Sequence, residues 1–155
     1  DLSYTDPTTN EKFVPHVLEP TFGLDRHVLA VLAAAYHEEA VGEHDTRIVL
    51  KLKPELAPVK IAVSPLLRNK PELVESAQAV YRQLKQHFGH VVYDDNGNIG
   101  KRYRRQDEIG TPLCVVIDFD TLNDQAVTVR HRDTMEQQRV AIKDLQDHCS
   151  KELTS

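Results

Sequence analysis

The sequence contains little cysteine, and its two thiols are far apart. Cys114 lies in an apolar run and Cys149 in a stretch with helical spacing, and no C-x-x-C motif is present. This argues against the disulfide framework of a small secreted protein. It predicts two buried free thiols in a reducing compartment, so we expect the chain to be cytoplasmic.

Patterns for a signal peptide, a membrane span or a metal site are also not expected from this sequence. No apolar run is long enough to cross a bilayer, and the first residues do not form a signal peptide. Eight histidines are scattered without metal-ligand spacing, so neither a membrane nor a metal site is expected. An overall positive charge is missing too, since the formal charge is −5. Any contact with nucleic acid must therefore come from a local patch.

The size and composition are those of an ordinary folded domain. The chain has 155 residues, of which 40% are hydrophobic and 28% charged, enough for one core and a fragment of a second domain. It begins at Asp1 without a methionine, which suggests a piece of a longer protein.

The residues from Asp94 to Pro112 carry the densest positive charge, in the run D-D-N-G-N-I-G-K-R-Y-R-R-Q-D-E-I-G-T-P. Asn96-Gly97 predicts a turn, and a short helix is expected over 99–109. Four cations precede the first acid of that helix: Lys101, Arg102, Arg104 and Arg105. A basic cluster on an acidic chain is typical of a surface that meets a polyanion. The alternative is a solvated helix face on which Arg104 and Arg105 pair with Glu108.

The first third of the chain contains a strand pattern and a helix pattern. We expect a buried strand over Lys12–Glu19, a glycine turn, and a helix from Leu24 to about Ala40. Arg26 near the start of that helix suits an anion, although a surface arginine is the simpler reading. An extended run follows from Arg47 to Lys53. Two prolines after it predict a linker, which divides the chain into residues 1–53 and 54–155.

The remainder reads as one α/β domain. Strands are expected over 59–63, 90–93, 113–119 and 126–132, with a loop over 120–125 between the last two. A helix is expected to start at Pro71 and stop at Gly89, followed by the basic helix and by a last helix that opens with a capping box at Thr134–Gln137. This predicts a mixed sheet of four to five strands flanked by three helices, preceded by a strand-helix unit. On the fourth strand, Arg130 either pairs with Asp118 or Asp133, or reaches splayed RNA bases.

The run E-P-T-F-G-L-D-R-H-V-L-A-V-L, from Glu19 to Leu32, closely resembles motif 3 of class II aminoacyl-tRNA synthetases, in the form found in glycyl-tRNA synthetases. The resemblance implies that Arg26 contacts the ATP phosphates and that Glu19 and Thr21 belong to a glycine pocket. Thr21 stands where the family usually has serine. The earlier motifs of the family are absent, so 1–53 would be the end of a catalytic domain with no catalytic residue acting in isolation.

The second part of the chain is similar to the anticodon-binding domain of the same synthetases. The similarity rests on V-S-P-L at Val63, the G-N-I-G-K-R-Y-R-R-Q-D-E-I-G-T-P run from Gly97, I-D-F-D-T at Ile117, and A-V-T-V-R-H-R-D-T-M-E-Q-Q-R at Ala126. It implies that the target is a tRNA anticodon loop. By that resemblance Asn96 and Arg130 would touch anticodon bases. The binding hypothesis adds contacts argued from charge, in which phosphates are held by Lys101, Arg102, Arg104 and Arg105, and base edges are also read by Asp107 and Glu108.

The chemistry of the carboxylates fits this implication. A carboxylate accepts from the exocyclic amine of cytosine, and glycine anticodons end in two cytosines. Asp107 and Glu108 could equally be salt-bridge partners within the helix, and both readings stay open.

The resemblance further implies a full-length glycine–tRNA ligase that joins glycine to tRNA(Gly) with ATP and Mg²⁺, and that is a homodimer. The fragment alone is expected to need no cofactor and to bind no DNA. A second hypothesis is a non-catalytic accessory or interaction protein built on the same kind of domain. Intact Glu19 and Arg26 argue against it, because such a descendant need not keep an ATP-binding arginine.

Overall fold

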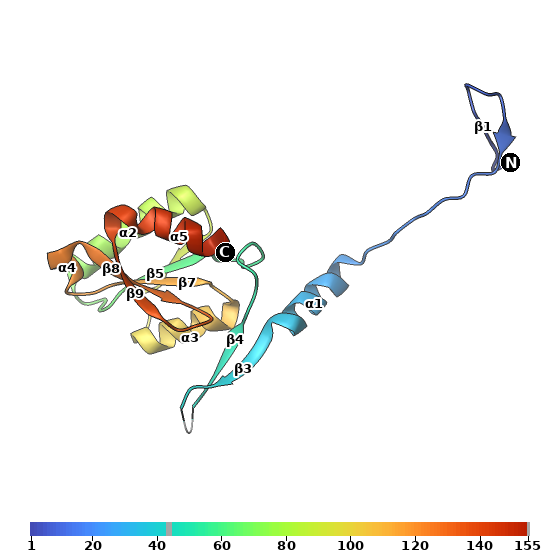
Figure 1. Ribbon diagram of the computed structural model, residues 1–155. Helices are drawn as coiled ribbons and strands as arrows, with labels where there is room; N and C mark the ends of the chain where they lie inside the picture. The colour runs from blue at the N-terminus through green and yellow to red at the C-terminus, as the bar shows by residue number, and fades with distance from the viewer. Residues whose placement is uncertain (43–44, 155) are drawn as a thin grey trace.

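The computed structural model describes residues 1–42 and 45–154, and its centre is a five-stranded mixed sheet (Figure 1). In sheet order the strands are β6 (Val91–Tyr93), β5 (Ile61–Pro65), β7 (Leu113–Ile117), β8 (Ala126–His131) and β9 (Gln137–Ala141). Strand β5 pairs in parallel with both β6 and β7, whereas β8 pairs antiparallel with both β7 and β9. The predicted α/β class with a mixed sheet is confirmed.

Helices cover the sheet on both faces (Figure 1). One face carries α2 (Pro71–Phe88) and α5 (Leu145–Thr154), the latter preceded by the 3₁₀ turn η1 (Ile142–Asp144). The main hydrophobic core lies under them, because alternate strand residues such as Ile61, Val63 and Val115 are fully buried there. The other face carries α3 (Ile99–Ile109), and the short α4 (Thr121–Asp124) joins β7 to β8.

A hairpin packs beside α3 and links the sheet domain to the segment before it. It consists of β3 (Tyr36–Ala40) and β4 (Thr46–Leu50), paired antiparallel. Gly110, at the end of α3, sits so close to β4 that an added Cβ would lie 2.9 Å from the Leu50 carbonyl oxygen. The contact between β4 and α3 therefore crosses the predicted boundary at 53/54, and the division into two domains stays a prediction.

The segment before the hairpin is largely exposed. It contains a two-strand turn of β1 (Tyr4–Thr5) and β2 (Lys12–Phe13), then a stretch without regular structure, then α1 (Leu24–Ala35). The prediction of a buried strand over Lys12–Glu19 is wrong, since both residues of β2 are exposed. The helix predicted to reach Ala40 ends at Ala35, because the next five residues pair with β4 instead.

Two further predictions need correction. The capping box at Thr134–Gln137 does not open a helix. Met135 takes a positive φ of 60° in a turn, and the next residues pair with β8 as β9, so sheet pairing outweighs the local helix signal. The loop expected between the third and fourth strands contains α4.

The expectations for the ends of α2 and for the cysteines hold. Pro71 opens α2 at its first turn and Gly89 ends it. Cys114 and Cys149 are buried and free, as predicted. Among the helices of the described residues, none is long and apolar enough to span a membrane.

Candidate nucleic-acid interface

The helix α3 has the bounds that its sequence predicts, because both ends are capped. The Asn98 side chain accepts a hydrogen bond from the Lys101 backbone N–H at 2.9 Å. Gly110 closes the helix in the left-handed conformation with φ 81°, and its N–H donates to the Asp107 carbonyl oxygen. Such caps satisfy backbone groups that a helix end leaves open, so the turn at Asn96-Gly97 is fixed against the helix.

The charged residues of α3 divide between two faces. Lys101, Arg104 and Glu108 are exposed and Arg105 is partly exposed. These four residues follow the spacing i, i+3, i+4, i+7, which places them in one stripe. Three cations and one carboxylate thus face outward, while Arg102 and Asp107 point inward with 2% of each residue exposed.

Arg102 binds backbone carbonyl oxygens of two separate segments. Its guanidinium donates to the carbonyl oxygens of Pro65, Asp95 and Gly97, the last two at 2.9 and 2.8 Å. Burial lowers the pKa of Arg102 from its ordinary value, against the raising effect of nearby carboxylates. The side chain therefore ties the end of β5 to the loop that carries Asn96.

The exposed arginines are held by segments outside α3. Arg104 donates to the carbonyl oxygen of Thr46 at 3.1 Å and pairs with the Asp45 carboxylate. Arg105 binds the Asp94 carboxylate at 2.8 Å and the Asn96 carbonyl oxygen at 2.6 Å. The alternative in which both pair with Glu108 is therefore not what the structure shows.

Two side chains of the interface keep their polar groups open to solvent. Within residues 1–42 and 45–154, the Lys101 ammonium has no hydrogen bond or ion pair. The exposed Asn96 uses its backbone in the turn, where its N–H donates to Asp94 and its carbonyl oxygen accepts from Arg105. Among the described residues its side-chain amide has no hydrogen-bond partner.

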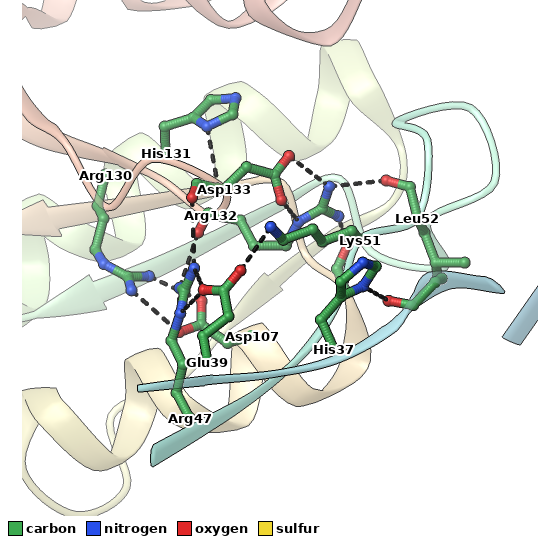
Figure 2. Close-up of polar contacts among 12 residues, drawn as sticks. His37, Glu39, Arg47, Lys51, Leu52, Asp107, Arg130, His131, Arg132 and Asp133 are labelled. Carbon is green, nitrogen blue, oxygen red and sulfur yellow. Dashed lines mark hydrogen bonds and ion pairs between the residues drawn. The ribbon is translucent and has the colours of Figure 1, made fainter. Parts of the chain in front are cut away.

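Asp107 lies at the centre of a buried ion cluster (Figure 2). Its Oδ1 accepts from Arg130 Nη1 at 2.9 Å, and its Oδ2 accepts from Arg130 Nη2 at 3.0 Å and from Arg47 Nη1 at 3.2 Å. Burial lowers the pKa of Arg130, but the hydrogen bonds and charge of Asp107 outweigh it and raise that pKa above its ordinary value. The predicted partners Asp118 and Asp133 are bound instead by Arg139 and Arg132.

The ring of Tyr103 covers the outer side of this pair. The Arg130 guanidinium carbon lies 4.7 Å from the ring centroid, within cation–π range. Burial raises the pKa of Tyr103 to about 12, so the phenol stays neutral in this position. Arg130 is consequently 6% exposed in the free chain.

The hairpin supplies Glu39 and Arg47 to the cluster, and Lys51 follows it directly. Arg47 also binds Glu39 at 2.6 Å, and Glu39 binds Lys51 at 2.5 Å. The Lys51 ammonium, followed by Arg47, lowers the pKa of Glu39 against the effect of burial. The cluster holds four cations and three carboxylates, which are Arg47, Lys51, Arg130, Arg132, Glu39, Asp107 and Asp133.

Sequence reasoning missed Arg47 and Arg132 as members of the site. Arg47 alternates with exposed neighbours and shares the inward side of β4 with the fully buried Val49. No signal in the sequence indicated this burial, because Arg47 shares its side of the run with Lys51, whereas the apolar Ile48 on the other side is exposed. Arg132 binds the carbonyl oxygens of Gly110 and Leu52, contacts that only the folded arrangement of three segments reveals.

The three residues assigned to ATP and glycine lie elsewhere. Glu19 and Thr21 are exposed in the stretch before α1, and Arg26 is exposed in the first turn of α1. In Figure 1 this segment extends away from the sheet domain, so the structure does not bring these residues to α3. In the part of the chain that the structure describes, no group of three or more His, Cys, Asp or Glu residues could hold a metal ion.

Comparison with known proteins identifies a family whose members this chain resembles. Residues 60–152 match the family model described as anticodon binding domain. The chain is 57% identical to the glycine–tRNA ligase of Ruminiclostridium cellulolyticum over 145 residues, which cover 94% of this chain and 30% of that protein. It is 55% identical over 157 residues to the glycine–tRNA ligase of Clostridium perfringens, covering 99% of this chain and 33% of the relative. The chain thus spans about a third of the length of these relatives.

A solved structure agrees with the fold. The crystal structure of the RNA-binding domain of threonyl-tRNA synthetase from Cryptosporidium parvum Iowa II superposes with a TM-score of 0.59 and 27% identity, covering 66% of this chain and 25% of that one. The mixed sheet, the capped basic helix and the family match over more than half of the chain lead to one conclusion. The chain belongs to the anticodon-binding domain family.

Proposed function

We propose that this chain recognises the anticodon loop of glycine tRNA, as the C-terminal part of a glycine–tRNA ligase. The observation that carries the proposal is the outward stripe of Lys101, Arg104, Arg105 and Glu108 on α3, which lies inside the residues that match the anticodon-binding family. Positive charge gathers there although the chain as a whole is acidic. The glycine specificity is suggested by relatives that share more than half of the aligned residues.

Phosphates of the loop would meet the three cations of the stripe. The Lys101 ammonium has no partner among the residues that the structure describes, and 46% and 41% of the Arg104 and Arg105 side chains are exposed. Contacts of this kind position an RNA and make binding depend on salt.

Base edges would meet Asn96, which precedes α3, and Glu108, the carboxylate of the stripe. The Asn96 amide offers both a donor and an acceptor, and the Glu108 carboxylate accepts from cytosine amines. Arg102, Asp107 and Arg130 are covered in the free chain. We assign Arg102 to holding the Asn96 loop. Arg130 would read a base once its ion pair with Asp107 opens, and we assign Asp107 to holding Arg130 and Arg47 rather than to a base.

The whole enzyme would activate glycine with ATP and Mg²⁺ and transfer it to the tRNA, as a cytoplasmic homodimer. In it Arg26 would contact ATP phosphates, and Glu19 and Thr21 would line the glycine pocket. All three are exposed here and enclose no site. The chain alone is therefore expected to show no glycine-dependent pyrophosphate exchange, and detectable exchange would contradict this expectation.

The test is binding of the chain to a glycine tRNA anticodon stem-loop, compared with a stem-loop in which the two cytosines are replaced, at two salt concentrations. We expect salt-sensitive binding that weakens with the altered loop. Lys101→Met should weaken binding to both loops alike and reduce the salt slope by about 1. Lys143→Met, an equal charge change on η1 at the opposite face of the sheet, is the matched control.

Other outcomes would redirect the assignment. Equal binding to the two loops would leave a basic patch without anticodon reading. Absence of binding would favour the accessory or protein-interaction role, which the exposed apolar residues of α1 would serve, among them Leu24, Val28 and Leu29.

A further inference from the structure

Asp107 is shared by two arginines that come from different parts of the chain. Arg130 lies on β8 of the sheet, whereas Arg47 lies on β4 of the hairpin, outside the residues matched by the family model. Both donate to the same oxygen, Asp107 Oδ2, at 3.0 and 3.2 Å (Figure 2). Two positive charges thus face one buried negative charge, and either arginine could balance Asp107 without the other.

The two arginines are anchored very differently. Arg47 also donates to the carbonyl oxygen of Arg132 at 2.9 Å and to Glu39 at 2.8 Å, so it stays in place whatever Asp107 does. In the described part of the chain, the hydrogen bonds of the Arg130 guanidinium all go to Asp107. Of the two, Arg130 is the one that can leave.

We infer that Arg47 is a positioning residue for anticodon reading, because it keeps Asp107 compensated while Arg130 turns away to bind an RNA base. The inference rests on the proposed function. Breaking a buried ion pair usually leaves an unpaired charge, which is strongly unfavourable. Here the remaining Arg47–Asp107 pair removes that penalty, so Arg130 can exchange one acceptor for another.

The surroundings of Arg130 suit such an exchange. Its other contact is the face of the Tyr103 ring, an interaction worth little enough to be replaced when a base stacks or hydrogen bonds nearby. Arg47 itself is 3% exposed and its donors are occupied, so it contacts no RNA in this scheme. It acts only through Asp107.

The experiment measures the affinity ratio between the stem-loop with two cytosines and the altered stem-loop, using the whole chain. Arg47→Met leaves Asp107 with Arg130 as its remaining partner and so locks Arg130 in place. The ratio should fall about tenfold, the size of one lost base contact, while the salt slope stays unchanged. Lys51→Met is the matched control, because Lys51 binds the same Glu39 without reaching Asp107.

A second change distinguishes release from a purely structural role. Asp107→Asn removes the charge that holds Arg130, so the ratio should persist in that variant. In the double variant Arg47→Met/Asp107→Asn the ratio should return toward that of the unchanged chain. A residue that merely stabilised the fold would give a double variant worse than either single one. Asp107→Asn also keeps the test decisive if Arg47→Met does not fold.

Three outcomes would overturn the inference: a ratio unchanged by Arg47→Met, no recovery in the double variant, or loss of the ratio in Asp107→Asn. Each leaves the proposed function standing, because the unchanged chain would still prefer the two cytosines. If the unchanged chain shows no preference, the proposed function fails and this inference fails with it.

Discussion

Similar apolar residues are exposed in the segment before the hairpin and buried in the sheet domain. In the first, Leu18, Leu24 and Leu29 are 96%, 77% and 68% exposed, and Ala35 is the one residue of α1 that is buried. In the second, Leu73 and Leu84 on α2 are fully buried. An amphipathic helix pattern therefore specifies which face is apolar, but a core forms only where a second layer lies against that face.

The hairpin of β3 and β4 belongs, by its contacts, with the sheet domain. Its Arg47 reaches Asp107, sixty residues away, and its Leu50 carbonyl oxygen lies against the end of α3. On these contacts we propose a boundary near Ala35, whereas composition predicts one after Lys53. Truncations, substitutions and acid unfolding can test where this boundary lies.

Two truncations should separate the hairpin from the segment before it. Deleting residues 1–33 should change the free energy of unfolding by less than about 0.5 kcal/mol, because no core residue is lost. Deleting residues 1–53 should cost about 3 kcal/mol or more, since Val49 and Leu52 are buried in this region and contribute about 1.5 to 3 kcal/mol each. Urea unfolding followed by circular dichroism measures both. Equal stability of the two truncated chains would return the boundary to residue 53.

Two leucine substitutions, one in each segment, should affect the free energy of unfolding very differently. Leu73→Ala should lower the free energy of unfolding by about 2 to 5 kcal/mol, because it leaves a cavity under α2. Leu29→Ala on α1 should change it by less than about 0.5 kcal/mol. Urea midpoints report the difference. A large loss from Leu29→Ala would mean that α1 is packed against something in solution.

Gly110 tests how tightly β4 is held to α3. Gly110→Ala should cost about 2 kcal/mol, because alanine disfavours the φ of 81° and its Cβ would press on Leu50 and Leu52. Gly97→Ala is the control, since its φ is 76° but the nearest atom, on the flexible Lys101 side chain, is 3.8 Å away. Thermal unfolding of both variants separates the contact from the backbone strain. Equal losses would mean that β4 can move off the helix.

The ends of the helices could be predicted from the sequence, because residues close to each end determine them. The bounds of α3 follow from Asn98 and Gly110, and those of α2 from Pro71 and Gly89, because caps act within a turn. The hairpin was missed because A-A-A-Y-H-E-E-A continues a helix pattern, and only its pairing with residues 46–50 makes it a strand.

The candidate site divides in the same way. The outward stripe of α3 could be read from helical spacing and from the family resemblance. The partners of its inward residues could not, because Arg47 and Arg130 reach Asp107 from sixty and twenty-three residues away. The burial of these charges could not be predicted from composition, because the sequence does not show which carboxylate will pair with a given arginine.

The effect of acid on stability should also differ between the two segments, by a smaller amount. The pKa of Asp118 is lowered from 3.8, because hydrogen bonds from Arg139 and Thr121 outweigh its burial. The pKa of Asp6 is lowered too, by backbone hydrogen bonds from Thr8 and Thr9 within one turn. A carboxylate with a depressed folded pKa contributes stability above its unfolded pKa, and this contribution is lost as pH falls through the folded value.

Asp118→Asn should therefore lower the urea midpoint at neutral pH, and its difference from the unchanged chain should shrink as pH falls from 3.8 downward. Asp6→Asn should leave the midpoint unchanged at every pH, because the turn that it stabilises is exposed and lies outside the cooperative core. Asp118 joins β7 to Arg139 on β9, so its loss is felt by the whole sheet. A pH-dependent effect of Asp6→Asn would mean that the first residues fold together with the sheet.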